Sequence, residues 1–346
     1  MRMKIKKIIV SALVLALAFS FTACGGGEAK AAPDTKTEDK KVVLHVGATV
    51  STTHAWYKAA QQMKDEIYEK SNGSIELVLD FAGVHGGDRE ITEAVQNGTL
   101  GMAICADIGF TQVVTDAGYV NLPYLFPTLE DVDKNYYNGW IGEAVKGSME
   151  KKGLEVLGFT DSDFRYITNS KHPIQKPEDL KNLKLRVPPN PMYVKFFAEL
   201  GAQPTAMSIG EVASALQQKA IDGQDNGPII TYTFGFQQFQ PYLTRTNHAF
   251  AGAAFFTGKT TMDQLSPNQQ KLMRELGEKY SAVATELIRQ DTAKYEEEMA
   301  ATTQILDNTP ELDAAFKEAA KKVWNDTEIT KAFDQEVMKK LLSQQQ

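Results

Sequence analysis

Arg186 is the residue whose setting most strongly indicates chemistry. It lies between Leu185 and Val187, at the end of an apolar stretch, and two prolines follow it. A guanidinium is costly to place among apolar side chains unless it has a partner, and its planar fork matches a carboxylate in two hydrogen bonds. Strand ends facing the crevice of an α/β protein are where ligands bind, so the partner is either a ligand carboxylate or an acidic neighbour within the protein. The residues alone leave both interpretations open.

Motifs for catalysis and for cofactors are absent from the sequence. There is no Gly-x-Ser-x-Gly elbow, no His-Glu-x-x-His, no Walker sequence and no dinucleotide fingerprint. Residues 83–88 are glycine-rich ahead of a helix, and a plain tight turn explains them more simply than an anion cradle. The five histidines, at 45, 54, 85, 172 and 248, show no metal-ligand spacing. We therefore expect no catalytic residue, no metal and no cofactor, and a protein that is not an enzyme.

The first 23 residues are predicted to be a lipoprotein signal peptide. Arg2 and three lysines precede the apolar residues 8–21, a run shorter than the roughly 20 residues that span a bilayer. Cys24 follows Ala23 where a lipoprotein signal peptidase would cut, although Phe21 stands where a leucine is usual. We expect Cys24 to be the lipidated N-terminus, which anchors the protein to a membrane outside the cytoplasm. Cys105 lies in an apolar run and is expected to be a small buried hydrophobe.

Residues 24–41 are predicted to be a flexible tether, because residues 28–41 contain no apolar side chain larger than alanine apart from one proline. The folded part then begins near Val42 and is long enough for two domains. The signal peptide takes four of the 37 basic residues with it, which leaves 33 against 44 acidic residues and a net charge of −11. This acidic balance excludes nucleic acid as an expected partner, and an anionic ligand must meet locally placed positive charge.

Strands and helices alternate along the folded part. Apolar periodicity predicts strands at 42–48, 75–81 and 100–105, with helices at 54–71 and 88–96 between them. A second unit repeats this order, with strands at 154–160, 165–169 and 183–187 and helices at 191–200 and 211–219. The alternation predicts the α/β class with largely parallel sheets.

A long helix is predicted near the C-terminus. Ser266 suits its N-cap and Pro267 its first position, and apolar residues recur at helical spacing as far as Met299. A helix of ~30 residues is ~45 Å long, about twice what one sheet needs, so it is suited to bridging two domains. A further helical segment over residues 312–342 is expected to close the fold.

Four stretches of the sequence are similar to a known family. They are Arg165 ahead of Thr168-Asn169, residues 177–188, residues 201–207 and residues 211–226. They resemble the extracytoplasmic solute-binding proteins of tripartite ATP-independent periplasmic (TRAP) transporters, and weaker similarity extends from Val42 to the C-terminal helices.

The resemblance implies a two-lobed, periplasmic-binding-protein-like α/β fold of type II, with a long helix that spans both lobes. Lobe I would comprise residues 42–162 and 252–291, and lobe II residues 163–251 and 292–346. The ligand would bind in the cleft between the lobes.

The resemblance also implies roles for four residues. Arg186 matches the arginine that clamps the ligand carboxylate, Arg165 matches a second arginine that lines the cleft, and Asn226 matches an asparagine that hydrogen-bonds the ligand. Ile209 stands where many relatives have an aromatic ring, so this wall of the pocket is expected to be smaller and aliphatic.

Four residues of the first lobe are weaker candidates for the ligand site. They are His54, Trp56, Ala106 and Asp107, and each either faces the cleft or is structural. Phe234 and Phe236 are further aromatic candidates, for which packing in the core is the simpler expectation.

The function implied by the resemblance is to capture a small organic acid and deliver it to the TRAP membrane permease. A C4 dicarboxylate is one candidate ligand, and a 2-oxo acid, an aromatic acid, a sugar acid or an amino acid is the alternative. A sensory receptor would use the same binding chemistry. A lipoprotein enzyme acting on such acids would need a nucleophile and a base near Arg186, and the sequence offers neither.

Overall fold

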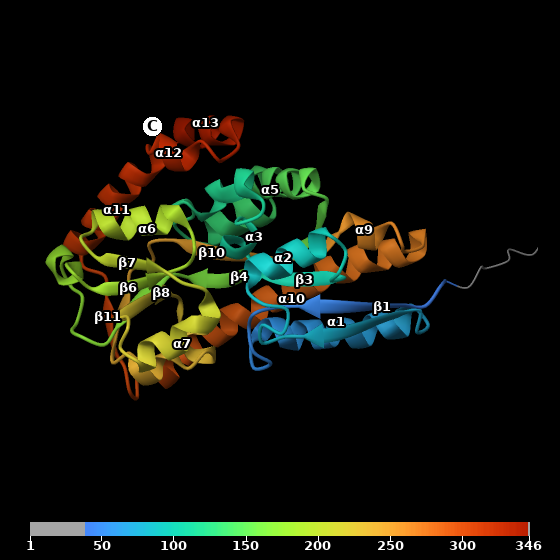
Figure 1. Cartoon of the computed structure of the whole chain (residues 1–346), viewed down its shortest axis with the longest axis horizontal. Helices are drawn as coiled ribbons and strands as arrows, with labels where there is room; N and C mark the ends of the chain where they lie inside the picture. Colours follow the sequence, from blue (N-terminus) through green and yellow to red (C-terminus); the bar gives the residue numbers. More distant parts are fainter. Residues whose placement is uncertain (1–38, 345–346) are drawn as a thin grey trace, which may run out of the picture. The chain divides into compact units, whose positions relative to one another are not determined.

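The computed structural model describes residues 39–344, which contain two β-sheets with helices packed on them (Figure 1). The first sheet has the order β2-β1-β3-β10-β4 and the second the order β11-β9-β5-β8-β6-β7. The signal peptide, Cys24 and nearly all of the tether predicted above lie outside the described residues. The strands are β1 (Val42–Gly47), β2 (Ile75–Asp80), β3 (Met102–Ala106), β4 (Leu154–Phe164), β5 (Tyr166–Asn169), β6 (Lys184–Val187), β7 (Gln203–Ala206), β8 (Gly223–Asn226), β9 (Tyr242–Arg245), β10 (Phe250–Gly258) and β11 (Gln304–Asp307).

The helices pack on both sheets, and the described part of the chain ends in a helix. The longer ones are α1 (Ala55–Lys70), α2 (Asp88–Gln96), α5 (Trp140–Lys151), α6 (Pro191–Glu199), α7 (Ile209–Gln217), α8 (Pro228–Thr233), α10 (Pro267–Met299), α11 (Pro310–Trp324) and α13 (Gln335–Gln344). Shorter turns are α3 (Asp107–Phe110), α4 (Leu129–Asp131), α9 (Lys259–Met262), α12 (Thr327–Thr330), η1 (Thr115–Asn121), the π-helical η2 (Val132–Tyr137), η3 (Pro177–Leu180) and η4 (Phe236–Phe239).

Each sheet is parallel except for one strand. In the first sheet β1 pairs in parallel with β2 and β3, while β10 is antiparallel to both β3 and β4. In the second sheet β6 is parallel to β7 and β8, β9 is parallel to β11, and β5 is antiparallel to β8 and β9. The predicted α/β class with largely parallel sheets is therefore confirmed.

The two antiparallel strands are the ones that follow a crossing between the sheets. Strand β4 ends at Phe164 in the first sheet and β5 begins at Tyr166 in the second, so Arg165 lies at the join. The chain returns from β9 in the second sheet to β10 in the first, and the backbone N–H of Arg165 donates to the carbonyl of Ala249 on this return (2.8 Å). The two crossing segments are thus held side by side. The division into lobes at the residue numbers given above stays a prediction.

Helix α10 is the predicted long helix, and it contains 33 residues. Ser266 and Gln269 form a capping box at its start, with Pro267 in the first turn. Gly277 packs closely on β4, since a Cβ there would lie 2.4 Å from Cβ of Leu157. Near the other end Tyr295 stacks on Tyr232 of α8, with ring centroids 4.3 Å apart. Helix α10 therefore contacts elements associated with both sheets, as expected.

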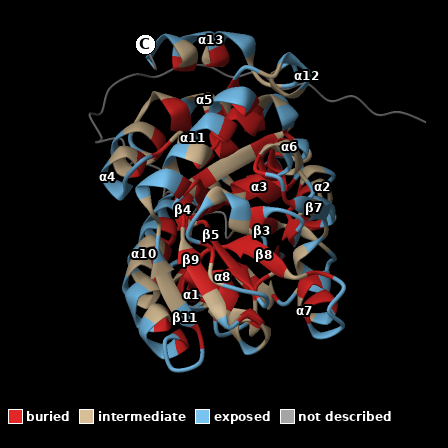
Figure 2. Ribbon diagram, turned by 90° about the vertical axis from the view of Figure 1, so that its left-hand side faces the viewer, coloured by how far each residue is buried: buried red, intermediate tan, exposed pale blue. Residues whose placement is uncertain are grey.

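Buried side chains are concentrated in the strands of both sheets, whereas the helices expose their outer faces (Figure 2). Strand β10 is buried along its whole length, because the sheet continues on both sides of it and helices cover its faces. The predicted C-terminal helical segment is divided into α11, α12 and α13. Among residues 39–344, no helix is both long enough and apolar enough to cross a membrane.

Candidate functional site

A cavity lies where the carboxyl ends of β1, β3, β6 and β8 meet, as expected for ligand sites in open α/β folds. It encloses about 190 Å³. At about 30 Å³ per water molecule this is room for on the order of six waters, and a cavity of about 150 Å³ can already hold a benzene ring, so the space suits a small organic acid. The lining residues are Thr49, Val50, Trp56, Gly87, Asp88, Arg89, Glu90, Ala106, Ile108, Gln112, Ser162, Arg165, Arg186, Pro188, Pro189, Ser208, Ile209, Asn226, Ile230, Phe234 and Ala251.

Arg186 lines this cavity from the end of β6 and is only 2% exposed. Its Nε and Nη2 both donate to the backbone carbonyl of Met207, at 3.0 and 2.8 Å. Within residues 39–344 no carboxylate lies in ion-pair contact with this guanidinium. Burial and the neighbouring positive charge of Arg165 lower the pKa of Arg186 to about 9. The site therefore holds a buried cation whose charge is not balanced by a direct ion pair.

Arg165 also lines the cavity, but its charge is balanced inside the protein. Its Nε donates to Oδ1 of Asp225 (2.9 Å), its Nη2 donates to the backbone carbonyl of Asp225, and the guanidinium lies over the ring of Tyr193. His248 contacts the same carboxylate oxygen through Nε2 (3.1 Å). Burial would raise the pKa of Asp225, yet the charges of Arg165 and His248 outweigh it and lower that pKa. The internal salt bridge considered for Arg186 thus occurs at Arg165 instead.

Asn226 lines the cavity from the end of β8, and its side chain is fixed by a polar network. Its Nδ2 donates to Oε1 of Gln224 at 2.5 Å. Gln224 in turn donates to the hydroxyls of Thr168 and Thr231, at 2.8 and 3.1 Å. All of these side chains are buried, so the amide of Asn226 is held in one orientation before any ligand arrives.

Trp56, Ala106 and Ile209 also line the cavity. The indole N–H of Trp56 donates to the backbone carbonyl of Asp161 on β4 (3.0 Å), which fixes the ring against the crossing strand. Ala106 ends β3, and Ile209 begins α7 next to its N-cap, Ser208. With Arg186, Arg165 and Asn226, six of the eight side chains expected at the site are therefore brought together around one cavity.

His54 and Asp107 are buried beside the cavity and are not among the residues that line it. Nδ1 of His54 accepts from the backbone N–H of Trp56 (3.1 Å) and caps α1. Asp107 accepts from the backbone N–H groups of Ile108 and Gly252, both at 2.8 Å, and so ties α3 to β10. Both residues are occupied with holding backbone, and we leave them out of the proposed ligand contacts.

Asp88 is a charged lining residue that was not among the ligand contacts expected from the sequence. It is the first residue of α2 and accepts from the hydroxyl of Thr49 (2.9 Å), while burial raises the pKa of its carboxyl group. The glycine-rich stretch before it was the available signal, but the sequence does not show that this turn aims a carboxylate into the cleft. Phe234 lines the cavity as well, whereas Phe236 is buried in the core.

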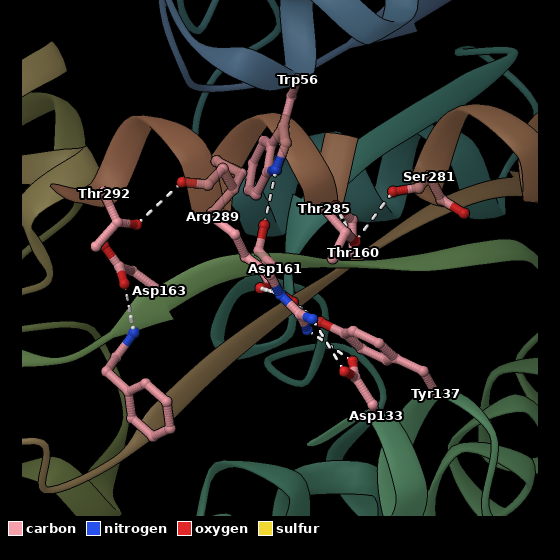
Figure 3. Close-up of polar contacts among 12 residues, drawn as sticks. Trp56, Asp133, Tyr137, Thr160, Asp161, Asp163, Ser281, Thr285, Arg289 and Thr292 are labelled. Carbon is pink, nitrogen blue, oxygen red and sulfur yellow. Dashed lines mark hydrogen bonds and ion pairs between the residues drawn. The ribbon is translucent and has the colours of Figure 1, made fainter. Parts of the chain in front are cut away.

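A charged network fixes the crossing strand behind Trp56 to the long helix (Figure 3). Nε of Arg289 on α10 lies 2.7 Å from Oδ2 of Asp161, and its Nη1 lies 2.9 Å from Oδ2 of Asp133. The hydroxyl of Tyr137 donates to the other oxygen of Asp161 (2.5 Å). Trp56 therefore packs against strand β4, which is held in place by Arg289 of α10 and by Tyr137.

Two sheets joined by crossing strands, with a cavity where the parallel strands end, define a two-lobed fold of the periplasmic-binding-protein type. The family model described as bacterial extracellular solute-binding protein, family 7, matches residues 46–331, and the chain belongs to that family. Solved structures similar to this chain at 25% and 26% identity are TRAP periplasmic solute-binding proteins, so the TRAP resemblance is confirmed.

Three relatives illustrate the similarity. The 2,3-diketo-L-gulonate-binding periplasmic protein YiaO of Escherichia coli is 28% identical over 251 residues, which are 72% of this chain and 76% of the relative. The sugar acid binding protein of Advenella mimigardefordensis, in complex with galactonate, superposes with a TM-score of 0.82 at 25% identity, covering 88% of this chain and 97% of that one. A TRAP solute-binding protein of Sulfurospirillum deleyianum with bound succinate superposes with a TM-score of 0.80 at 24% identity, covering 88% and 99%.

The buried His54 leads to an expected pH dependence of stability. Burial, reinforced by the positive charge of Lys58, lowers its pKa in the folded protein to about 3. Below the ordinary histidine pKa of about 6.5, His54 becomes protonated in the unfolded chain but stays neutral in the folded protein. Stability therefore falls as the pH falls. Between pH 7 and pH 5 His54 should cost about 2 kcal/mol of unfolding free energy.

The test is His54→Asn, which keeps a side chain that can cap α1. Denaturant unfolding at pH 7 and pH 5 should show the wild-type protein losing about 2 kcal/mol more than the variant. His172→Asn is the matched control, because His172 is exposed and should leave the wild-type pH dependence in place. An equal loss of unfolding free energy in the wild type and in His54→Asn would show that His54 is not the source of the pH dependence.

Proposed function

We propose that this protein binds a small hydroxylated monocarboxylic acid in the cavity, with the carboxylate on Arg186, and delivers it to a TRAP membrane permease. The observation that carries the proposal is the buried Arg186 guanidinium, which lacks an ion-pair partner among the described residues. A ligand carboxylate would supply the missing negative charge in two charge-assisted hydrogen bonds. Because Arg186 is buried away from bulk water, these bonds are stronger there than in water.

One carboxylate is favoured over two by the charges around the cavity. Of the three lining arginines, Arg165 is paired with Asp225 and Arg89 with Glu93, which leaves Arg186 as the unpaired one in the described part of the chain. Asp88 and Glu90 add carboxylates to the wall formed by the first sheet. A second ligand carboxylate would be repelled there, whereas ligand hydroxyl groups would donate to these oxygens.

The remaining polar lining residues suit the hydroxyl groups of such a ligand. Ser162, Ser208 and Gln112 add groups that both donate and accept, while Trp56 and Ile209 offer apolar surface to the carbon chain. The relatives that bind 2,3-diketo-L-gulonate and galactonate carry hydroxylated monocarboxylates. The relative with bound succinate carries a dicarboxylate, which makes succinate the informative competitor.

A ligand screen tests the proposed class. After unfolding and refolding to remove co-purified acid, galactonate or gulonate should raise the melting temperature, while the corresponding amides should not. A ligand at a concentration one hundred times its Kd stabilises the folded state by about 2.7 kcal/mol. A larger shift with succinate than with any hydroxylated monocarboxylate would overturn the proposed class, and equal shifts with acid and amide would overturn the carboxylate contact.

Replacement of the clamp residue is the second test. Arg186→Gln should weaken binding of the best acid by at least about tenfold, or about 1.4 kcal/mol, because charge-assisted hydrogen bonds are lost. Arg274→Gln is the control, since Arg274 pairs with Glu155 on the exposed surface and does not line the cavity. Isothermal titration calorimetry measures both. A loss of less than about tenfold in Arg186→Gln would show that another group holds the carboxylate.

We further propose that the exported protein is anchored through a lipid on Cys24, which rests on the sequence pattern of residues 1–24. In cell fractionation, Cys24→Ala should move the protein from the membrane pellet to the soluble fraction. Cys105→Ala should leave it in the pellet, because Cys105 is buried within β3. Membrane association that survives Cys24→Ala would rule out this anchor.

A further inference from the structure

Three potential metal ligands meet on the surface beside the first sheet, away from the residues that line the cavity. They are His45 on β1, Asp80 at the end of β2 and His85 in the loop that follows β2. Their separation along the chain is not a ligand spacing, and for this reason the sequence analysis expected no metal. The parallel pairing of β1 with β2 brings them together, since His45 pairs with Val78 and Gly47 pairs with Asp80.

The three side chains converge on one point. Nδ1 of His45 and Nε2 of His85 lie 2.6 and 2.8 Å from the same carboxylate oxygen of Asp80, and the three ligand atoms all lie within 4.8 Å of one another. All three side chains are accessible from solvent, with exposed fractions of 51%, 19% and 34% for His45, Asp80 and His85.

The backbone around the cluster is well fixed. The N–H of Ala82 donates to the carbonyl of Val50 (2.8 Å), and the N–H of Gly83 donates to that of Ala48 (3.0 Å). The loop closes with a bond from Gly86 to Gly83 (3.0 Å). The three ligands therefore come from two paired strands and from a loop that is held by backbone hydrogen bonds. Their backbone is already ordered before an ion binds.

We propose that His45, Asp80 and His85 form a binding site for a divalent transition-metal ion such as Zn²⁺. Two imidazole nitrogens and one carboxylate oxygen are a known ligand set for Zn²⁺, which leaves a fourth position for water. With bonds of about 2.0–2.1 Å, ligand atoms in a tetrahedral site are about 3.3 Å apart. The two observed nitrogen-to-oxygen distances of 2.6 and 2.8 Å are shorter than that value and the distance between the two nitrogens is at most 4.8 Å, so side-chain rotations must bring all three to it. Mg²⁺ and Ca²⁺ prefer oxygen ligands and do not suit two imidazoles.

The position of the cluster gives the site a structural consequence. The loop that carries His85 continues through Gly87 to Asp88, both of which line the cavity. The same loop lies close to the start of α7, since a Cβ on Gly87 would lie 4.0 Å from Oγ of Ser208, the N-cap of that helix. An ion bound by these three residues would cross-link β1 and β2 to the loop that presents Asp88.

Calorimetric titration of the chelator-treated, tag-free protein with ZnCl₂ tests the site. One Zn²⁺ should bind per chain, and MgCl₂ should give no such binding. His45→Gln and His85→Gln each remove one imidazole ligand and should weaken Zn²⁺ binding by at least about tenfold. Replacing a residue that only hydrogen-bonds to a metal ligand already lowers metal affinity by about 10–100-fold. His172→Gln removes an exposed histidine outside the cluster and should bind Zn²⁺ like the wild type.

Melting curves without metal show whether each variant is folded, and both histidine variants change exposed side chains that lie outside the core. Absence of one-to-one Zn²⁺ binding in the wild type would overturn the proposal. Zn²⁺ binding that is unchanged in folded His45→Gln and His85→Gln would overturn it as well, because the ion would then be held elsewhere. Neither result depends on whether the cavity binds an organic acid.

Discussion

A guanidinium buried without a carboxylate partner is the constraint around which the site is built. Two arginines point into one small cavity, and their like charges oppose each other's burial. The carboxylate of Asp225, which His248 also contacts, balances the charge of Arg165, whereas Arg186 has only the carbonyl of Met207 as a hydrogen-bond acceptor among the described residues. A buried cation in this state costs free energy that an anionic ligand can return. In the proposed function, a ligand carboxylate supplies the negative charge that the protein itself does not place beside Arg186.

The rest of the fold positions the two sides of the cavity relative to that charge. The parallel strands of both sheets end at the cavity, so loops and helix starts supply Asp88 from one side and Asn226 from the other. The crossing strand β4 lies between them, fixed to α10 through the contact of Asp161 with Arg289, and it holds the ring of Trp56. Closure of such a cleft strengthens the charged hydrogen bond by excluding water, and no covalent step is needed.

The sequence predicted much of this arrangement, and its failures have physical causes. Capping signals at Ser266 located the long helix. The setting of Arg186 singled it out as a residue of the cleft, which it lines, while its role as the carboxylate clamp comes from the family resemblance and stays a proposal. Strand β10 was not predicted, because a continuous apolar run buried on both faces lacks the alternation that identifies a strand. For His54 the sequence left a place at the cleft and a structural role equally open, because a residue at a helix start can serve either, and the three-dimensional contacts show it capping α1. Asp88 could not be placed, because its direction depends on a turn whose geometry the sequence does not specify.

A crystal structure of the protein with its best hydroxylated monocarboxylate would test the central claim most directly. The account predicts that both carboxylate oxygens of the ligand lie within hydrogen-bond distance of the Arg186 guanidinium, while Arg165 keeps its pairing with Asp225. A ligand whose carboxylate lies elsewhere in the cleft, with Arg186 still bonded only to the carbonyl of Met207, would contradict it.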